Sequence, residues 1–166
     1  MKSPPVEIDA IDRRILDILQ RDGRIAIVAL AEQVGLSATP CLRRVKRLEE
    51  EGVITGYGAI VDPGRVGLGL DAIVQVSLRD HAEDDVLGFE RAVQACPEVV
   101  AFYVLTGDID YLLRIRVPDL ESYSEFAMKT LLRMPGVKDT RTSFVLRVGK
   151  ETRVVPMGGG PPLTQP

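Results

Sequence analysis

The segment from Ser37 to Glu51, SATPCLRRVKRLEEE, constrains the fold of this chain most, because it predicts a helix with two unlike faces. At about 100° per residue, Cys41, Val45 and Leu48 point to one side. The opposite side carries polar and basic residues, namely Thr39, Arg43, Lys46 and Arg47. A helix dipole favours acids first and bases last, yet here the acids follow the bases. The basic face therefore indicates a surface for an anionic partner.

The flanking residues predict a helix-turn-helix. Asp9 is placed to cap a first helix, which Gly23 ends. A second helix is expected from about Ile27 to Val34, with Gly35 as the left-handed residue after it. Ser37 is expected to cap the third helix, and an extended segment, VITGYGAIV, follows Gly52. Three helices with a strand ribbon make a winged or near-winged helix-turn-helix, whose expected core is Ile11, Ile15, Leu19, Leu30, Val34, Leu42, Val45, Leu48 and Ile54.

Charge and cysteine content narrow the function classes. The net charge is -3, and the first 52 residues hold nine Lys or Arg and nine Asp or Glu, so DNA binding would need a local patch and would depend on salt. Cys41 and Cys96 lie far apart without a histidine cluster, so we expect reduced packing residues and no metal site. No apolar run predicts a membrane span, and a cytoplasmic protein without a membrane partner is expected.

The second half of the chain predicts an α+β domain. After a turn at Asp62-Pro63-Gly64, strand and helix patterns alternate in the order βαββαβ, the ferredoxin-like arrangement. Strands are expected at Ala72–Leu78, Val99–Leu105, Tyr111–Val117 and Thr140–Val148, and helices at Ala82–Ala95 and after Asp119. The predicted domains are a helix-turn-helix at 1–61, a linker at 62–69, a ferredoxin-like effector and assembly domain at 70–150, and a disordered tail at 151–166.

Three separated motifs resemble the Lrp/AsnC family of bacterial and archaeal regulators: LAEQVGLSATPCLRRVKRLEEEGVITGY, LTGDIDYLLRIRVPD and LLRMPGVKDTRTSFVL. The resemblance covers roughly Ile8 to Leu146. It implies an N-terminal DNA-binding helix-turn-helix and a βαββαβ effector domain, in dimers that often assemble into octamers and respond to amino acids. One departure is Ala26, where the family usually has a small polar cap, which leaves the start of the second helix open.

Two sets of site residues follow. For DNA, we expect Thr39, Arg43 and Arg47 to reach base edges and Ser37 and Arg44 to reach phosphates, with Pro40 beside them.

For the amino acid, the resemblance implies the GDxDY turn and the TRT segment. In that set Asp108 or Asp110 would bind the ammonium and the threonines the carboxylate, whereas strand alternation should point Arg141 the other way. The implied effector residues are Gly107, Asp108, Asp110, Tyr111, Thr140 and Thr142.

Other interpretations stay open. Gly107-Asp108 is also what a simple hairpin turn requires. An effector-independent architectural DNA-binding protein has the same helix-turn-helix, and a ferredoxin-like domain alone could bind or transform a small molecule. No nucleophile-and-base set accompanies the carboxylates, so we expect no catalytic residues, and no cofactor beyond an amino-acid effector.

Overall fold

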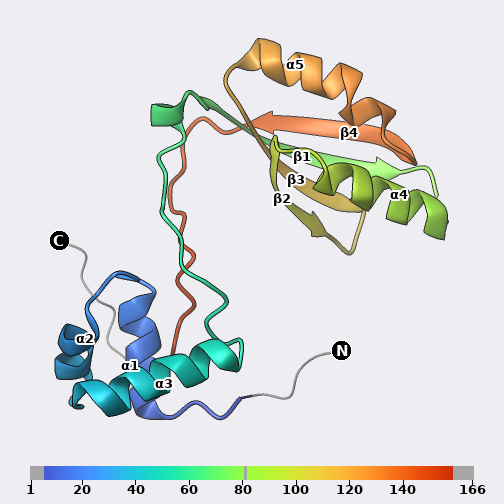
Figure 1. The fold of residues 1–166 in the computed structure, drawn as a ribbon. Coiled ribbons are helices and arrows are strands. Elements are labelled where there is room, and N and C mark those ends of the chain that lie inside the picture. Colours follow the sequence, from blue (N-terminus) through green and yellow to red (C-terminus); the bar gives the residue numbers. More distant parts are fainter. Residues whose placement is uncertain (1–5, 81, 159–166) are drawn as a thin grey trace. The chain divides into compact units, whose positions relative to one another are not determined.

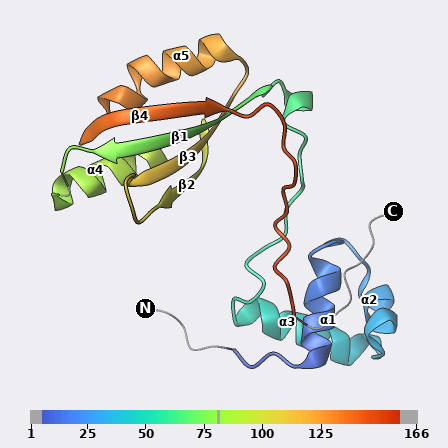
Figure 2. The same cartoon turned by 180° about the vertical axis from the view of Figure 1, so that it is seen from behind.

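The computed structural model describes residues 6–80 and 82–158, and the chain forms two compact units (Figures 1 and 2). One unit contains Met1–Ile60 together with Lys150–Pro166, and the other contains Val61–Gly149. The chain therefore leaves the first unit, builds the second and returns to the first.

The first unit is a helix-turn-helix made of α1 (Ala10–Leu19), α2 (Ile27–Val34) and α3 (Ala38–Glu50). Asp9 caps α1 as predicted, and α2 starts without a side-chain cap at Ala26. The turn between α2 and α3 depends on Gly35, whose φ of 75° is a conformation that favours glycine. Ser37 occupies the N-cap position of α3, but its side chain makes no capping hydrogen bond, so that prediction is wrong.

The core of this unit lies between the three helices. Ile15, Leu30, Cys41 and Leu48 are fully buried there, which explains why Cys41 is a packing residue. Leu42 was expected in the core but is 39% exposed, because it lies one residue beyond the buried stripe of α3. The expected ribbon after α3 is not a sheet, since residues 53–60 contain no strand.

The second unit has the predicted ferredoxin-like architecture. Its strands are β1 (Leu70–Leu78), β2 (Val99–Val104), β3 (Tyr111–Val117) and β4 (Val137–Phe144). They form one antiparallel sheet in the order β2-β3-β1-β4. The last strand spans Val137–Phe144, earlier than the predicted Thr140–Val148. The elements in chain order are η1 (Gly64–Val66), β1 (Leu70–Leu78), α4 (Glu83–Gln94), β2 (Val99–Val104), β3 (Tyr111–Val117), α5 (Leu120–Lys129), η2 (Leu131–Arg133) and β4.

Alternation along the strands gives the sheet two different faces. Val74 and Val76 of β1 are buried against Phe89 of α4 and Phe126 of α5, so both helices pack on one face. The neighbouring positions of β1 point to the opposite face, which no helix in the described part of this unit covers. That uncovered face is where the polar residues described below gather.

The C-terminal segment differs from expectation. We predicted disorder for residues 151–166, yet backbone atoms of Val155 and Met157 are hydrogen-bonded to the side chains of Gln20, the C-cap residue of α1, and Arg13 of α1. Residues 159–166 lie outside the described part of the chain. Among the described residues, no helix is long and apolar enough to cross a membrane, and no group of His, Cys, Asp and Glu could hold a metal ion.

Candidate DNA-binding and ligand-binding sites

The solvent-facing side of α3 carries a short basic stripe. Thr39, Arg43 and Lys46 lie about one helical turn apart, and all three are exposed. Within residues 6–80 and 82–158, neither Arg43 nor Lys46 forms an ion pair. Two cations and one hydroxyl are thus available to a partner on a single helix face. Ser37 and Pro40 lie in the first turn beside this stripe, and Ser37 is exposed.

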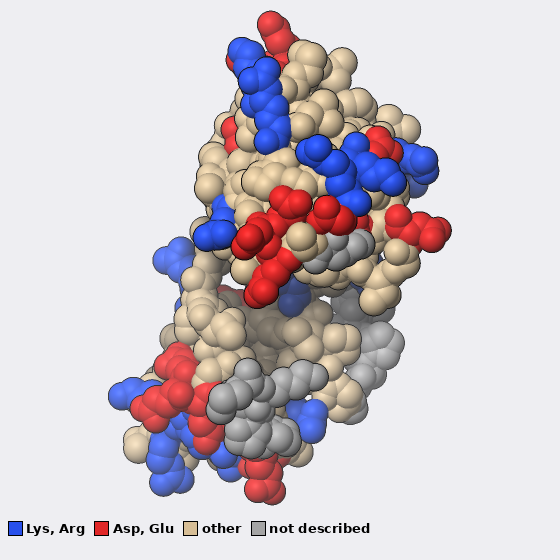
Figure 3. Space-filling view, turned by 90° about the vertical axis from the view of Figure 1, so that its right-hand side faces the viewer, with Lys and Arg blue, Asp and Glu red and all other residues tan. Residues whose placement is uncertain are grey.

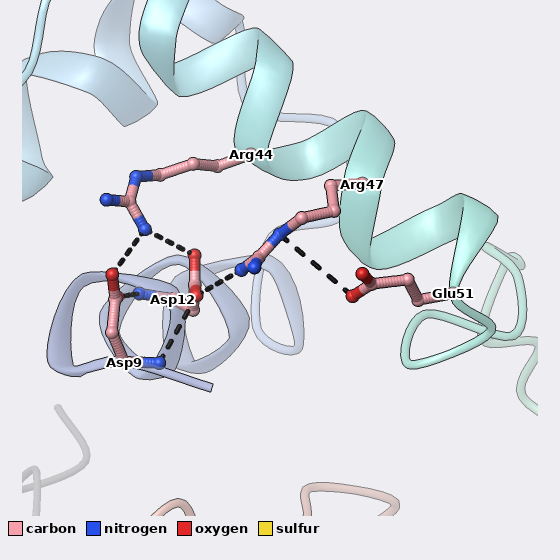
Figure 4. A network of polar contacts seen from close by, with 5 residues as sticks. All are labelled: Asp9, Asp12, Arg44, Arg47 and Glu51. Carbon is pink, nitrogen blue, oxygen red and sulfur yellow. Dashed lines mark hydrogen bonds and ion pairs between the residues drawn. The ribbon is translucent and has the colours of Figure 1, made fainter. Parts of the chain in front are cut away.

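Arg44 and Arg47 lie beside this stripe, are partly exposed, and reach across to the start of α1 (Figure 4). One terminal nitrogen of Arg44 donates to Asp9 Oδ2 at 2.6 Å and to Asp12 Oδ1 at 2.9 Å. A terminal nitrogen of Arg47 donates to Asp12 Oδ2, and its Nε lies 4.0 Å from Glu51. Two of the residues predicted to contact DNA are therefore committed to contacts within the protein.

Asp12 is the centre of this network. Its side chain is 1% exposed and also accepts a hydrogen bond from the Asp9 backbone N–H, which completes a reciprocal capping box at the start of α1. A buried carboxylate is tolerated only when it is paired and hydrogen-bonded, and here both oxygens are satisfied. The Asp12 backbone N–H, with help from Arg44, holds the pKa of Asp9 below its usual value. The network joins α3 to the N-terminus of α1.

Charge is distributed differently on the visible faces of the two lobes in Figure 3. Basic and acidic side chains are interleaved on the lobe with the helix-turn-helix, in keeping with the balanced charge of its sequence. The other lobe shows an acidic patch where α4 begins with Glu83, Asp84 and Asp85. Any electrostatic attraction for DNA must therefore be local, and the α3 stripe is a local source.

The predicted effector residues do not converge on one site. Tyr111 is 2% exposed and donates its hydroxyl hydrogen bond to Glu90 at 3.1 Å, on the helix-covered face. The hydroxyl groups of Thr142 and Tyr123 are hydrogen-bonded to each other on that same face. Thr140 pairs with Val76 and thus has the same orientation as Thr142.

Asp110 has a structural contact at the edge of the sheet. Its Oδ2 accepts a hydrogen bond from the Leu78 backbone N–H at 2.7 Å, and its own backbone N–H donates to Val76 at 3.1 Å. These bonds fix the β2–β3 turn against the end of β1. Gly107 in this turn has a φ of 119°, so the backbone there favours glycine.

A polar cleft of about 320 Å³ opens on the uncovered face of the sheet. It is lined by Gln75 and Ser77 of β1, Asp108 and Ile109 of the β2–β3 turn, and Asp139 and Arg141 of β4. The cleft offers two carboxylates and one guanidinium, which complement the ammonium and the carboxylate of a zwitterion. Asp108 is the one predicted effector residue that lines it.

Sequence reasoning missed most of this cleft. Gln75, Ser77 and Asp139 share a face with Arg141 because β1 pairs with β4 in the register Gln75 to Arg141 and Ser77 to Asp139. The alternation argument did place Arg141 opposite the threonines, which is confirmed. Extending the same argument to β1 would have found Gln75 and Ser77, whereas the register between β1 and β4 is not encoded locally.

A helix-turn-helix with an exposed basic stripe, followed by a ferredoxin-like domain with a polar cleft, defines a ligand-responsive class of DNA-binding regulator. Two family models match the chain in the same order. Residues 8–55 match the winged helix-turn-helix DNA-binding model, and residues 71–155 match the Lrp/AsnC ligand binding domain.

Relatives and solved structures agree with these matches. The leucine-responsive regulatory proteins of Escherichia coli K12 and Klebsiella pneumoniae are each 46% identical over 151 residues, covering 91% of this chain and 92% of theirs. A Neisseria meningitidis transcriptional regulator in complex with L-Met has a TM-score of 0.89 at 42% identity, covering 92% of this chain and 98% of its own. An AsnC family regulator from Agrobacterium tumefaciens has a TM-score of 0.86 at 38% identity, with coverages of 90% and 97%.

The chain belongs to the Lrp/AsnC family of transcription regulators. It combines a DNA-binding helix-turn-helix with a ligand-binding domain, and its relatives are regulators rather than enzymes.

Proposed function

We propose that this regulator reads double-stranded DNA through the exposed stripe of α3. In this proposal Thr39 and Arg43 contact base edges. Lys46, Ser37 and the first turn at Pro40 contact the phosphate backbone. The observation that carries this assignment is the division of the α3 cations into an exposed stripe and a pair bound to α1. Arg44 and Arg47 then position α3 and contribute little direct readout.

The test is binding to the protein's own upstream region, against random competitor DNA, at fixed salt. Arg43→Ala should weaken specific binding about 5- to 150-fold, which corresponds to losing a contact of about 1–3 kcal/mol. Arg133→Ala in η2 removes the same charge from the other unit and should leave affinity unchanged. If Arg47→Ala keeps its fold and loses more specificity than Arg43→Ala, then Arg47 contacts the bases and the assignment is wrong.

We further propose that a small amino acid is the effector and that it binds in the polar cleft. Arg141 would pair with its carboxylate, and Asp108 or Asp139 with its ammonium, while Gln75 and Ser77 supply neutral hydrogen bonds. Support comes from this charge pattern, the ligand-binding family model and the solved regulator that holds L-Met. In this proposal Asp110, Tyr111, Thr140 and Thr142 shape the domain without touching the ligand, and Gly107 shapes the turn beside it.

Calorimetric titration with individual amino acids tests the effector site. Arg141→Ala should lower the affinity at least about tenfold, as expected for loss of a charge-assisted pair. Lys138→Ala, also on β4, is the matched control because Lys138 does not line the cleft. If no amino acid binds while specific DNA binding persists, the protein is an effector-independent architectural DNA-binding protein.

We also propose that the working form is a homodimer, able to assemble to an octamer in the cytoplasm, where its DNA is. The uncovered face of the sheet supports this, because it presents apolar side chains such as Ile73 and Tyr103 among its polar ones. A dimer presents two α3 helices to half-sites about one DNA turn, or a multiple of it, apart. Light scattering with and without the amino acid tests the assembly state.

A further inference from the structure

The C-terminal segment is bound by a two-sided contact to Gln20, the C-cap residue of α1. The Gln20 side-chain amide donates to the Val155 carbonyl oxygen at 3.2 Å, and the Val155 N–H donates to Gln20 Oε1 at 2.6 Å. One side chain thus satisfies both backbone polar groups of one residue, as a neighbouring strand would. Such a contact fixes the segment at a particular residue rather than somewhere along its length.

Two further contacts extend this attachment. Arg13 donates a hydrogen bond from a terminal nitrogen to the Met157 carbonyl oxygen at 3.1 Å. The Met157 side chain is half-buried and packs against the core of the helix-turn-helix. Arg13 of α1 and the C-cap residue Gln20 lie seven residues apart, about two helical turns, so they bind the segment at separated points on one side of the helix. The docked region, Val154–Met157, is called the strap below.

The position of the strap in the chain gives it a consequence for the whole protein. It follows β4, the last strand of the ligand-binding unit, whereas the first connection between the units precedes β1. The DNA-binding unit is therefore attached to the ligand-binding unit at two places. A unit held by one irregular linker samples many orientations, and a second attachment removes much of that freedom.

We propose that the strap limits the orientations of the DNA-binding unit, so that a dimer accepts only a narrow range of half-site spacings. The proposal rests on the DNA-reading role of α3 proposed above. Strand β4 carries Asp139 and Arg141 of the cleft. A short segment of chain leads from the end of β4 to the strap, which contacts the helix-turn-helix at Gln20. It is thereby a second route from the ligand cleft to the helix-turn-helix, which is covalent as far as the strap and hydrogen-bonded from the strap to Gln20 and Arg13.

Hydrogen exchange on the full-length protein tests the docking without reference to DNA. In the unaltered protein, backbone amides of the strap should be protected. Gln20→Ala should speed their exchange about tenfold, because two hydrogen bonds are lost, while the sheet remains unchanged. Gln33→Ala, which truncates an exposed glutamine of α2, should have no effect on the strap. Equal exchange of the strap in all three proteins would overturn the proposal.

Operator spacing tests the consequence. Affinities are measured for the selected operator and for versions with the half-sites moved apart by about half a turn, roughly 5 base pairs. The unaltered protein and Gln33→Ala should bind the altered spacing at least about tenfold more weakly, and this ratio should fall several-fold in Gln20→Ala. The same ratio in all three, or no spacing preference at all, overturns the proposal. Loss of all specific DNA binding in the unaltered protein would instead refute the proposed function, and hydrogen exchange would still decide whether the strap docks.

Discussion

The Asp12 carboxylate accepts hydrogen bonds from Arg44 and Arg47 of α3 and from the Asp9 backbone N–H, so one charged group makes three contacts. Substituting Asp12→Asn preserves the volume but removes the charge. Because Arg44 and Arg47 are partly exposed and can rehydrate, we expect a stability loss of about 2 kcal/mol rather than the full penalty of a deeply buried pair. Thermal or urea unfolding followed by a probe in the helix-turn-helix measures this loss.

Asp17→Asn provides the control for that measurement. Asp17 is on the same helix, and its partner is Arg21, four residues away, with both side chains more than one-third exposed. Surface pairs of this kind contribute less than about 0.5 kcal/mol. Equal effects of the two substitutions would show that the Asp12 network does not hold α3.

The pair Arg47 and Lys46 separates stability from DNA binding at adjacent residues. Arg47→Ala should destabilise the helix-turn-helix, because Asp12 loses a donor in a buried position. Lys46→Ala should change the free energy of unfolding by less than about 0.5 kcal/mol, since Lys46 is exposed, and should weaken DNA binding. Unfolding curves and binding isotherms on the same two variants check this. A destabilised Lys46→Ala protein with normal DNA affinity would reverse the assignment.

Among the strands, β1 and β3 are joined by a partly buried ion cluster. Asp71 of β1 accepts hydrogen bonds from Arg116 at 2.7 Å and from Arg114 at 2.6 Å, and its side chain is 15% exposed. The Arg116 hydrogen bonds, followed by those of Arg114, lower the pKa of Asp71 against the opposing effect of burial. A lowered pKa in the folded state means that the charged form stabilises the native sheet.

The pH dependence of this cluster has a definite sign. The stabilisation by Asp71 should be fully present above its unfolded pKa of about 4 and should be lost as the pH falls through the lower folded pKa. Asp71→Asn should therefore cost about 1–3 kcal/mol near neutral pH, and the difference should shrink in acid. Denaturant unfolding of both proteins at pH 7 and pH 3 measures it, with Asp62→Asn as an exposed control. A difference that does not change with pH would exclude an electrostatic origin.

Elements whose signals are local were predictable from the sequence. The caps Asp9 and Asp119 and the left-handed Gly35 are set by neighbours within a few residues, and the helices begin and end beside them. The edge strand β4 was placed too late because its start, with Lys138 and Asp139 exposed, lacks an apolar alternation. Its position depends on pairing with β1, which no local pattern encodes.

The sites were less predictable for the same reason. Helical angles correctly placed Arg43 on the solvent-facing side of α3. They could not show that Arg44 and Arg47 bind Asp12, which lies more than thirty residues away in the sequence. Likewise, Asp139 and Ser77 meet only through strand register. Side-chain identity indicates what a residue can bind, whereas long-range pairing determines which partner it finds.

At the scale of the whole molecule, the net charge of -3 leaves local basic patches as the source of attraction for DNA, so under the proposed function the affinity should rest on a few phosphate contacts from each α3. The logarithm of the binding constant should fall linearly with the logarithm of the salt concentration, with a slope of about -0.9 for each phosphate contacted. A homodimer carries each substitution twice. If Lys46 contacts one phosphate in each half-site, Lys46→Ala should therefore make the slope shallower by about 1.8.

Arg43→Ala separates base reading from backbone contact in the same titration. A base contact carries sequence information, so its removal should reduce the ratio of operator to random-DNA affinity and change the salt slope less than Lys46→Ala does. A slope change near 0.9 in Lys46→Ala would indicate that only one α3 of the assembly engages DNA. If the slope is unchanged in both variants, the α3 stripe does not contact phosphates, because each cation that contacts a phosphate releases counterions and contributes to the slope.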